Sequence, residues 1–206
     1  MKKKTILVAA IAVMLVAALV VGGTLAYFTD TKTADNTFTM GNVAITLDET
    51  NADPNAPTGS RVDGNTYNVY PGQTVTKDPI VHNTGRNAAY IRATVTVSNW
   101  ATLSKELYPN VALADTLKEL VGSFGEGWSV VGAAADNSGA VTFTLKYDRQ
   151  LAASADTAPM FQQVTVRAGL EYENASSFKT MTVQAQAIQA DGLPTWEAAF
   201  NAFDGK

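Results

Sequence analysis

The feature that most restricts the fold of this sequence is a period of two in its apolar residues, which recurs in four separate segments. In "AYIRATVTV" (89–97), apolar residues occupy every second position, and threonines and an arginine alternate with them. Because successive side chains of a β-strand point to opposite faces, this alternation predicts half-buried antiparallel strands. The four apolar rows are Val43, Ile45, Leu47; Ile91, Ala93, Val95, Val97; Val141, Phe143, Leu145, Tyr147; and Met181, Val183, Ala185, Ala187.

Shorter strands and glycine-containing turns complete the expected fold. Candidate strands cover residues 67–70, 74–83, 128–132 and 161–166, and Pro79 places the second of these at a sheet edge or a bulge. Turn sequences separate the strands at Pro71-Gly72, Asn83-Thr84-Gly85, Asn137-Ser138-Gly139 and Asp191-Gly192. Seven or eight such strands predict an all-β fold, an antiparallel β-sandwich of the jelly-roll or immunoglobulin type.

Two short peripheral helices are predicted beside the strands. In residues 113–124 the apolar side chains recur at helical spacing, and Gly122 marks the end of the helix. In "PTWEAAFNAF" (194–203), Thr195 is the expected N-cap, followed by three aromatic residues at helical spacing. The apolar stripes consist of Leu113, Leu117, Leu120 and Val121 in the first helix and of Trp196, Phe200 and Phe203 in the second.

The chain begins with three lysines and a long apolar run, which is the pattern of a secretory signal peptide. Residues 5–21 would span about 26 Å as a helix, near the lower limit for crossing a membrane. The glycines at 22–23 break this signal helix, and Thr24 and Ala26 supply small residues for a peptidase. We therefore expect cleavage between Ala26 and Tyr27. An uncleaved membrane anchor is the alternative.

The charge and the absence of cysteine exclude several classes of protein. Removal of Lys2, Lys3 and Lys4 with the signal takes the formal net charge from −4 to −7 and leaves no basic cluster, which argues against nucleic acid as a partner. Without cysteine the chain has no disulfide, no cysteine-ligated zinc and no thiol nucleophile. The remaining chain of about 180 residues is long enough for one domain with its own core.

Residues that could support catalysis are scarce. His82 is the single histidine and lies at the end of a predicted strand, whereas zinc hydrolases use two or three histidines, often in an H-E-x-x-H helix. We interpret His82 as a structural or surface residue. Glu171 and Glu173 share one strand face and could bind a cation, although a solvated strand edge is the simpler interpretation. We expect no catalytic residue, no bound metal and no cofactor.

The segment "GGTLAYFTDTKTADNTFTMGNVAITLDE" (22–49) resembles the processing region of the TasA/camelysin family. The family pattern is Gly-Gly-Thr, a small residue at the cut, an aromatic residue and Asp just after it, and then Phe and Gly before the first core strand. The matching positions are Gly22, Gly23, Thr24, Ala26, Phe28, Asp30, Phe38 and Gly41. Residues 69–92, 145–166 and 183–193 also resemble the family.

This resemblance implies an exported bacterial surface or biofilm-matrix protein, a jelly-roll-like sandwich, and a signal that is cut by a SipW-type peptidase. In fibre-forming members, the mature N-terminal segment of one subunit inserts as a strand into the next subunit. Residues 27–41 would be that donor strand, with Tyr27, Phe28 and Phe38 as anchors and Asp30 keeping the segment soluble. Its threonines supply β-propensity. The alternative is a flexible leader or the first strand of the chain's own domain.

The sequence therefore predicts three parts: a signal peptide (1–26), a donor segment (27–41) and a β-sandwich domain (42–206). The expected function is a non-enzymatic structural subunit of an extracellular fibre, secreted or held at the cell surface. Its expected partners are copies of itself, a SipW-type signal peptidase during export and accessory matrix proteins, with membrane contact only through an uncleaved signal. The alternative is a cell-surface metallopeptidase of the camelysin type.

Overall fold

The computed structural model describes residues 42–49, 71–168 and 180–206 of the chain. The predicted signal peptide (1–26), the donor segment (27–41) and the short strand at 67–70 lie outside these residues. So does the pair of glutamates in "LEYEN".

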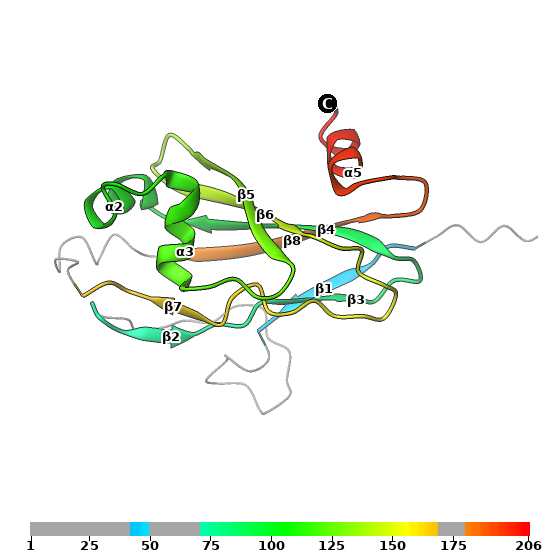
Figure 1. Cartoon of the computed structure of the whole chain (residues 1–206), viewed down its shortest axis with the longest axis horizontal. Helices are drawn as coiled ribbons and strands as arrows, with labels where there is room; N and C mark the ends of the chain where they lie inside the picture. Colours follow the sequence, from blue (N-terminus) through cyan, green and yellow to red (C-terminus); the bar gives the residue numbers. More distant parts are fainter. Residues whose placement is uncertain (1–41, 50–70, 169–179) are drawn as a thin grey trace, which may run out of the picture. The chain divides into compact units, whose positions relative to one another are not determined.

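Four antiparallel strands form the larger sheet, in the order β5-β6-β4-β8 (Figure 1). Their bounds are Trp128–Ala135 for β5, Val141–Tyr147 for β6, Ala89–Val97 for β4 and Met181–Gln189 for β8. The register brings the predicted apolar rows together, because Val95 of β4 lies opposite Phe143 of β6 on one side and Val183 of β8 on the other. The alternation of apolar residues in the sequence correctly predicted three of these strands, β4, β6 and β8.

The second layer consists of two short antiparallel pairs. One pair is β1 (Ile45–Asp48) with β3 (Ile80–Asn83), and the other is β2 (Thr74–Thr76) with β7 (Gln163–Thr165). The single strand predicted at 74–83 is instead divided into β2 and β3, and Pro79, which has no N–H to donate, lies between them. At Pro79 the backbone still pairs with the segment before β7, because Met160 N donates a hydrogen bond to Pro79 O at 2.8 Å.

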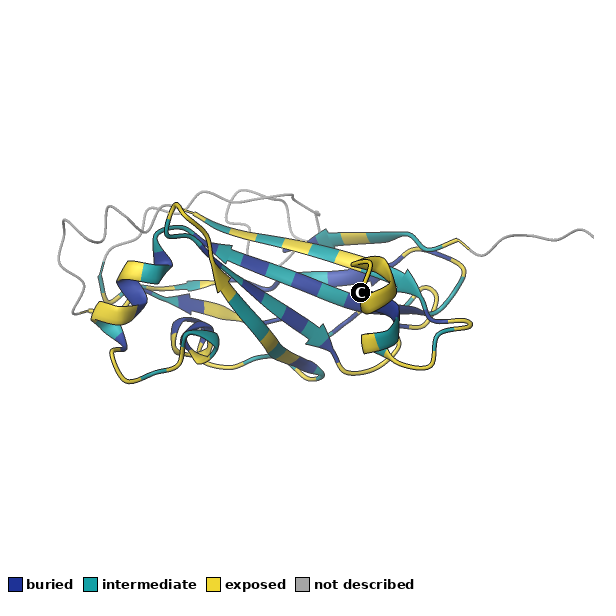
Figure 2. Ribbon diagram, turned by 90° about the horizontal axis from the view of Figure 1, so that it is seen from above, coloured by how far each residue is buried: buried dark blue, intermediate teal, exposed yellow. Residues whose placement is uncertain are grey.

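A single apolar cluster joins side chains of both layers. Val81 of the second layer and Phe143 and Val95 of the first are fully buried in this same cluster. Along β4 and β6, buried side chains alternate with partly exposed ones (Figure 2). The described residues therefore form an all-β, antiparallel sandwich. The jelly-roll order of strands is a finer prediction that these short pairs do not test.

The two predicted helices are confirmed. A 3₁₀ turn (η1, Leu113–Asp115) leads into α3 (Thr116–Val121), which ends at Gly122, where φ is 77°. Helix α5 (Trp196–Phe203) begins at Thr195, whose side chain accepts a hydrogen bond from Ala198 N at 3.1 Å.

Sequence reasoning missed a third helix, α2 (Trp100–Leu107), which follows β4 directly. Its preceding residue, Asn99, has a φ of 52° and its side chain makes no capping hydrogen bond, so the usual start signal is absent. Burial holds α2 in place, because Trp100 is buried and its Nε1 donates to Thr116 Oγ1 at 2.9 Å. In the described part of the chain, no helix is long and apolar enough to span a membrane.

Candidate functional site

The single histidine of the chain lies in β3, between two other segments. Across one edge of β3, the register places His82 opposite Thr46 of β1. Across the other edge, an isolated antiparallel bridge places it opposite Asp156. His82 is therefore positioned at the meeting point of three chain segments and is only 8% exposed.

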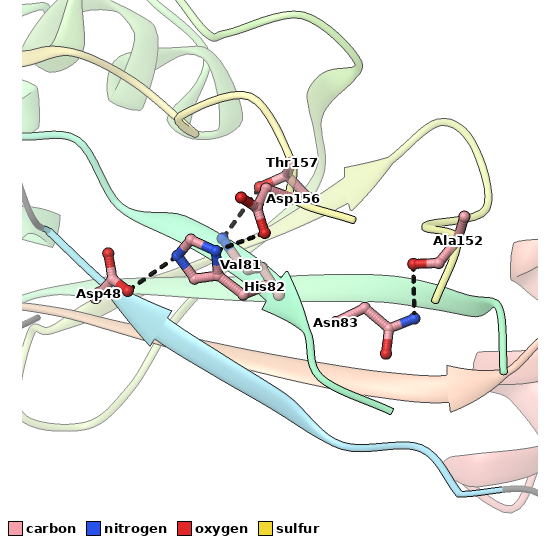
Figure 3. A network of polar contacts seen from close by, with 7 residues as sticks. All are labelled: Asp48, Val81, His82, Asn83, Ala152, Asp156 and Thr157. Carbon is pink, nitrogen blue, oxygen red and sulfur yellow. Dashed lines mark hydrogen bonds and ion pairs between the residues drawn. The ribbon is translucent and has the colours of Figure 1, made fainter. Parts of the chain in front are cut away.

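Both ring nitrogens of His82 contact carboxylates. Nε2 lies 2.9 Å from Asp48 Oδ2 and Nδ1 lies 2.6 Å from Asp156 Oδ1, on opposite sides of the ring (Figure 3). The contact at Nδ1 is a hydrogen bond with Asp156, whereas the contact at Nε2 is within ion-pair distance of Asp48 but lacks hydrogen-bond geometry. The two carboxylates differ in environment, because the Asp48 side chain is 2% exposed and that of Asp156 is 60% exposed.

The residues on either side of His82 tie β3 to the same loop. Asn83 Nδ2 donates to the backbone oxygens of Leu151 and Ala152 at 3.0 and 3.1 Å. Val81 N donates to Thr157 Oγ1 at 3.1 Å. Three consecutive residues of β3 thus hold the segment 151–157 (Figure 3). We call the contacts of Asp48, His82 and Asp156 the histidine clasp.

A second buried ion pair lies at the end of β1. Lys77 Nζ is 2.7 Å from both carboxylate oxygens of Glu49, and both side chains are almost completely buried. Glu49 follows Asp48, so two consecutive carboxylates at this end of β1 each meet a basic side chain from residues 77–82. Such pairs specify which segments meet, and removal of one partner is costly because a buried charge is left behind.

The donor set at His82 does not fit a catalytic zinc ion. Structural and catalytic zinc sites gather three or four ligands around one point. Here the carboxylates lie at opposite nitrogens of one imidazole, and Asp48 is in direct contact with the nitrogen that a metal would need. Within residues 42–49, 71–168 and 180–206, no three His, Asp or Glu side chains are grouped so that they could hold a metal ion. We assign the histidine clasp a structural role.

One surface hollow among the described residues offers few groups for catalysis. It measures about 220 Å³ and lies beside α2 and η1. Its lining includes Lys105, Tyr108 and Leu113 but no histidine and no carboxylate. General acid–base catalysis most often uses a histidine, and Lys105 and Tyr108 are the side chains of this lining that could also transfer a proton.

Of the candidate site residues named from the sequence, the structure describes His82 but not the processing residues or the proposed anchors. His82 was interpreted as structural or surface, and it is a buried structural residue. Its partners Asp48 and Asp156 were missed. Asp48 continues the side of the strand predicted to face solvent, and Asp156 lies in a loop with no motif. The processing residues Thr24, Ala26 and Tyr27 and the proposed anchors lie outside the described residues and stay predictions.

Comparison with known proteins identifies a family for the N-terminal part of the chain. Residues 1–99 match the family described as camelysin metallo-endopeptidase, which is just under half of the 206 residues. The matched region contains the 22–49 motif and the strands β1 to β4. No curated protein matches the chain. The match supports the resemblance inferred from the sequence: residues 1–99 are similar to the camelysin family, which includes TasA and CalY.

Proposed function

We propose that this chain is an exported structural subunit of an extracellular fibre or biofilm matrix. Copies would join when residues 27–41 of one subunit add as a strand to the sandwich of the next. The observation that carries this proposal is the state of His82: the one histidine is buried and held at both nitrogens by carboxylates. The residue best suited to metallopeptidase chemistry is thus part of the packing of the sandwich.

The composition of the N-terminal segment supports strand addition. Threonines at alternate positions favour extended backbone, while Asp30, Lys32 and Asp35 would keep the segment soluble before docking. Phe28 and Phe38 could fill pockets of a neighbouring subunit. Added strands obtain affinity from main-chain hydrogen bonds and specificity from alternate side chains. The basic start, apolar run and small residues at 24–26 support export and removal of the signal by a SipW-type peptidase.

A cell-surface peptidase is the second candidate, and the family description metallo-endopeptidase is the observation that favours it. Such an enzyme would need metal ligands other than His82, drawn mostly from carboxylates. Carboxylate oxygens suit calcium or magnesium better than catalytic zinc.

Imaging and a proteolysis assay on the same secreted protein separate the two candidates. We expect long particles in negative-stain micrographs, formed equally well with and without a chelator, and no degradation of casein. Casein cleavage that disappears with the chelator and returns with added zinc would support the peptidase instead. A matched variant, His82→Gln, would show whether any cleavage depends on the histidine, provided that its circular dichroism spectrum matches that of the parent.

A further inference from the structure

The free edges of the sheets differ in how well they are protected. A strand at a sheet edge presents unpaired N–H and C=O groups, and natural proteins blunt such edges with short strands, charges, prolines or bulges. In the second layer, β1 has four residues and ends in Asp48, and β2 has three residues and is soon followed by Pro79. These edges are therefore short, and a charged residue or a proline lies at or near the end of each strand.

The larger sheet has a protected edge at β5. The pairing of β5 with β6 shifts register between Val130 and Gly132, which is a β-bulge or similar irregularity. Bulges twist a strand and interrupt its ladder, so they oppose the addition of another strand. The turn η1 also contacts β5.

The opposite edge strand, β8, has none of these protective features: it is not short and it contains no charge, proline or bulge. Its nine residues, "MTVQAQAIQ", include no charge and no proline, and its register with β4 is regular from end to end. Within the described residues, β8 pairs only with β4 and its other edge has no strand. A long, uncharged and regular edge is a template for pairing with another chain.

The apolar row of β8 is also incompletely covered. On the neighbouring strand β4, Ile91, Val95 and Val97 are completely buried. The corresponding row of β8 is only half-buried over its whole length, at Met181, Val183, Ala185 and Ala187.

The other layer is similarly open beside β8. Strand β1 contacts β8 across the layers, and its apolar residues Ile45 and Leu47, with Val43 just before it, are half-buried as well. A strand added at the edge of β8 would therefore cover apolar side chains of both layers, and burial of apolar surface favours association by about 25 cal/mol per Å².

We propose that the edge of β8 that no described strand covers accepts a strand from a second copy of this chain, and that the strand is residues 27–40. This inference rests on the proposed function and specifies the surface that it needs. The 14 residues span about 46 Å when extended, at about 3.3 Å per residue, which exceeds the roughly 30 Å of β8. Because residue 40 lies only two positions before Asn42, a donor strand at 27–40 would join β1 without a long linker.

Cysteine cross-linking tests which edge is used, because the chain has no cysteine of its own. One set of mature chains carries a single cysteine in the donor segment, at Thr31, Thr33 or Thr37 in turn. A second, size-tagged chain carries Gln184→Cys on β8, and its matched control carries Ser129→Cys on β5. Both acceptor positions are exposed. A disulfide requires Cα atoms within about 7 Å, so it forms only between adjacent strands.

We expect a mixed disulfide with Gln184→Cys for at least one donor position during fibre growth, at a yield several-fold above Ser129→Cys. Equal or greater yield at Ser129→Cys, or fibres without any cross-link to Gln184→Cys, would overturn the assignment to β8 but leave the fibre proposal standing. If the parent chain forms no particles under any condition, both proposals fail.

A charge on the half-buried row gives an independent test. Ala185→Lys places an ammonium group where the added strand would pack, whereas Gln184→Lys places the same charge on the exposed face of the same strand. Inward charges on edge strands oppose pairing between chains. We expect fibre growth to slow at least tenfold for Ala185→Lys and to change less than twofold for Gln184→Lys, with both monomers melting within a few degrees of the parent. Equal growth rates for the two variants would contradict the proposal.

Discussion

Replacement of His82 by alanine measures how much the histidine clasp contributes to stability. The Asp48 side chain is 2% exposed, and its carboxylate would lose the imidazole that lies 2.9 Å away. Removal of one partner from a buried ion pair typically costs about 3–5 kcal/mol. Since a domain has a total unfolding free energy of about 5–15 kcal/mol, we expect His82→Ala to remove a large share of it.

The second carboxylate of the clasp provides the matched control. Asp156 is closer to the ring, at 2.6 Å, but its side chain is 60% exposed. Exposed ion pairs contribute only about 0–1 kcal/mol, so Asp156→Asn should lower the unfolding free energy by less than about 1 kcal/mol. Comparing His82→Ala with Asp156→Asn therefore tests whether burial or distance determines the energy of these contacts.

Urea unfolding followed by tryptophan fluorescence measures both effects, because Trp100 and Trp128 are buried in the core. With a denaturant dependence of about 2 kcal/mol per molar, His82→Ala should lower the midpoint by roughly 2 M and Asp156→Asn by less than about 0.5 M. If the two variants lost equal stability, or if His82→Ala lost less than about 1 kcal/mol, the argument from burial would be refuted.

Three further predictions concern export, the core and the C-terminal helix. Mass spectrometry of secreted protein should find Tyr27 as the first residue, and Ala26→Phe should hold the full-length chain in the membrane fraction, because a bulky residue does not suit the peptidase site. Val95→Asp should abolish the cooperative β-sheet circular dichroism signal, since Val95 is completely buried, whereas Thr94→Asp on the other face should fold. Hydrogen bonds from Arg92 lower the pKa of Asp204 below its ordinary value of 3.8. The stabilisation of α5 by these bonds is therefore present above about pH 4 and is lost as the pH falls through the lowered pKa. Tryptophan fluorescence from α5 should report this loss before the core unfolds.

The long strands could be predicted from the sequence because their burial is periodic. The alternation in residues 89–97 coincides with β4, since every second side chain enters the core. Helix α2 was not predicted because its stability depends on a distant contact, the hydrogen bond from Trp100 to Thr116. The single strand expected at 74–83 was also wrong in detail, because Pro79 divides it.

The histidine clasp shows where reasoning from sequence stops. The sequence contains no second histidine that could bind zinc together with His82, which favours the interpretation of His82 as a structural or surface residue. Its partners could not be found, because Asp156 lies 74 residues further along the chain and no motif links the two. The sandwich brings them together by placing the loop at 151–157 along the free side of β3.

Truncation of the donor segment tests assembly most directly. A chain that begins at Asn42 keeps all the described strands, so we expect it to fold as a monomer, with reduced stability because the edge of β8 stays uncovered. It should form no fibres by itself. Sedimentation and negative-stain imaging, compared with the chain that begins at Tyr27, measure the difference.

A synthetic peptide of residues 27–40 completes this test, because it should restore what the truncation removes. Added to the chain that begins at Asn42, the peptide should raise the melting temperature, and added to the mature chain it should cap growing fibres. Phe28→Asp and Phe38→Asp should each impair assembly far more than Lys32→Ala, because an aromatic anchor in a partner's pocket contributes about 2 kcal/mol or more and an exposed charge almost nothing. Fibres formed by the Asn42 chain as readily as by the mature chain would show that the aromatic segment belongs to its own domain and does not join subunits.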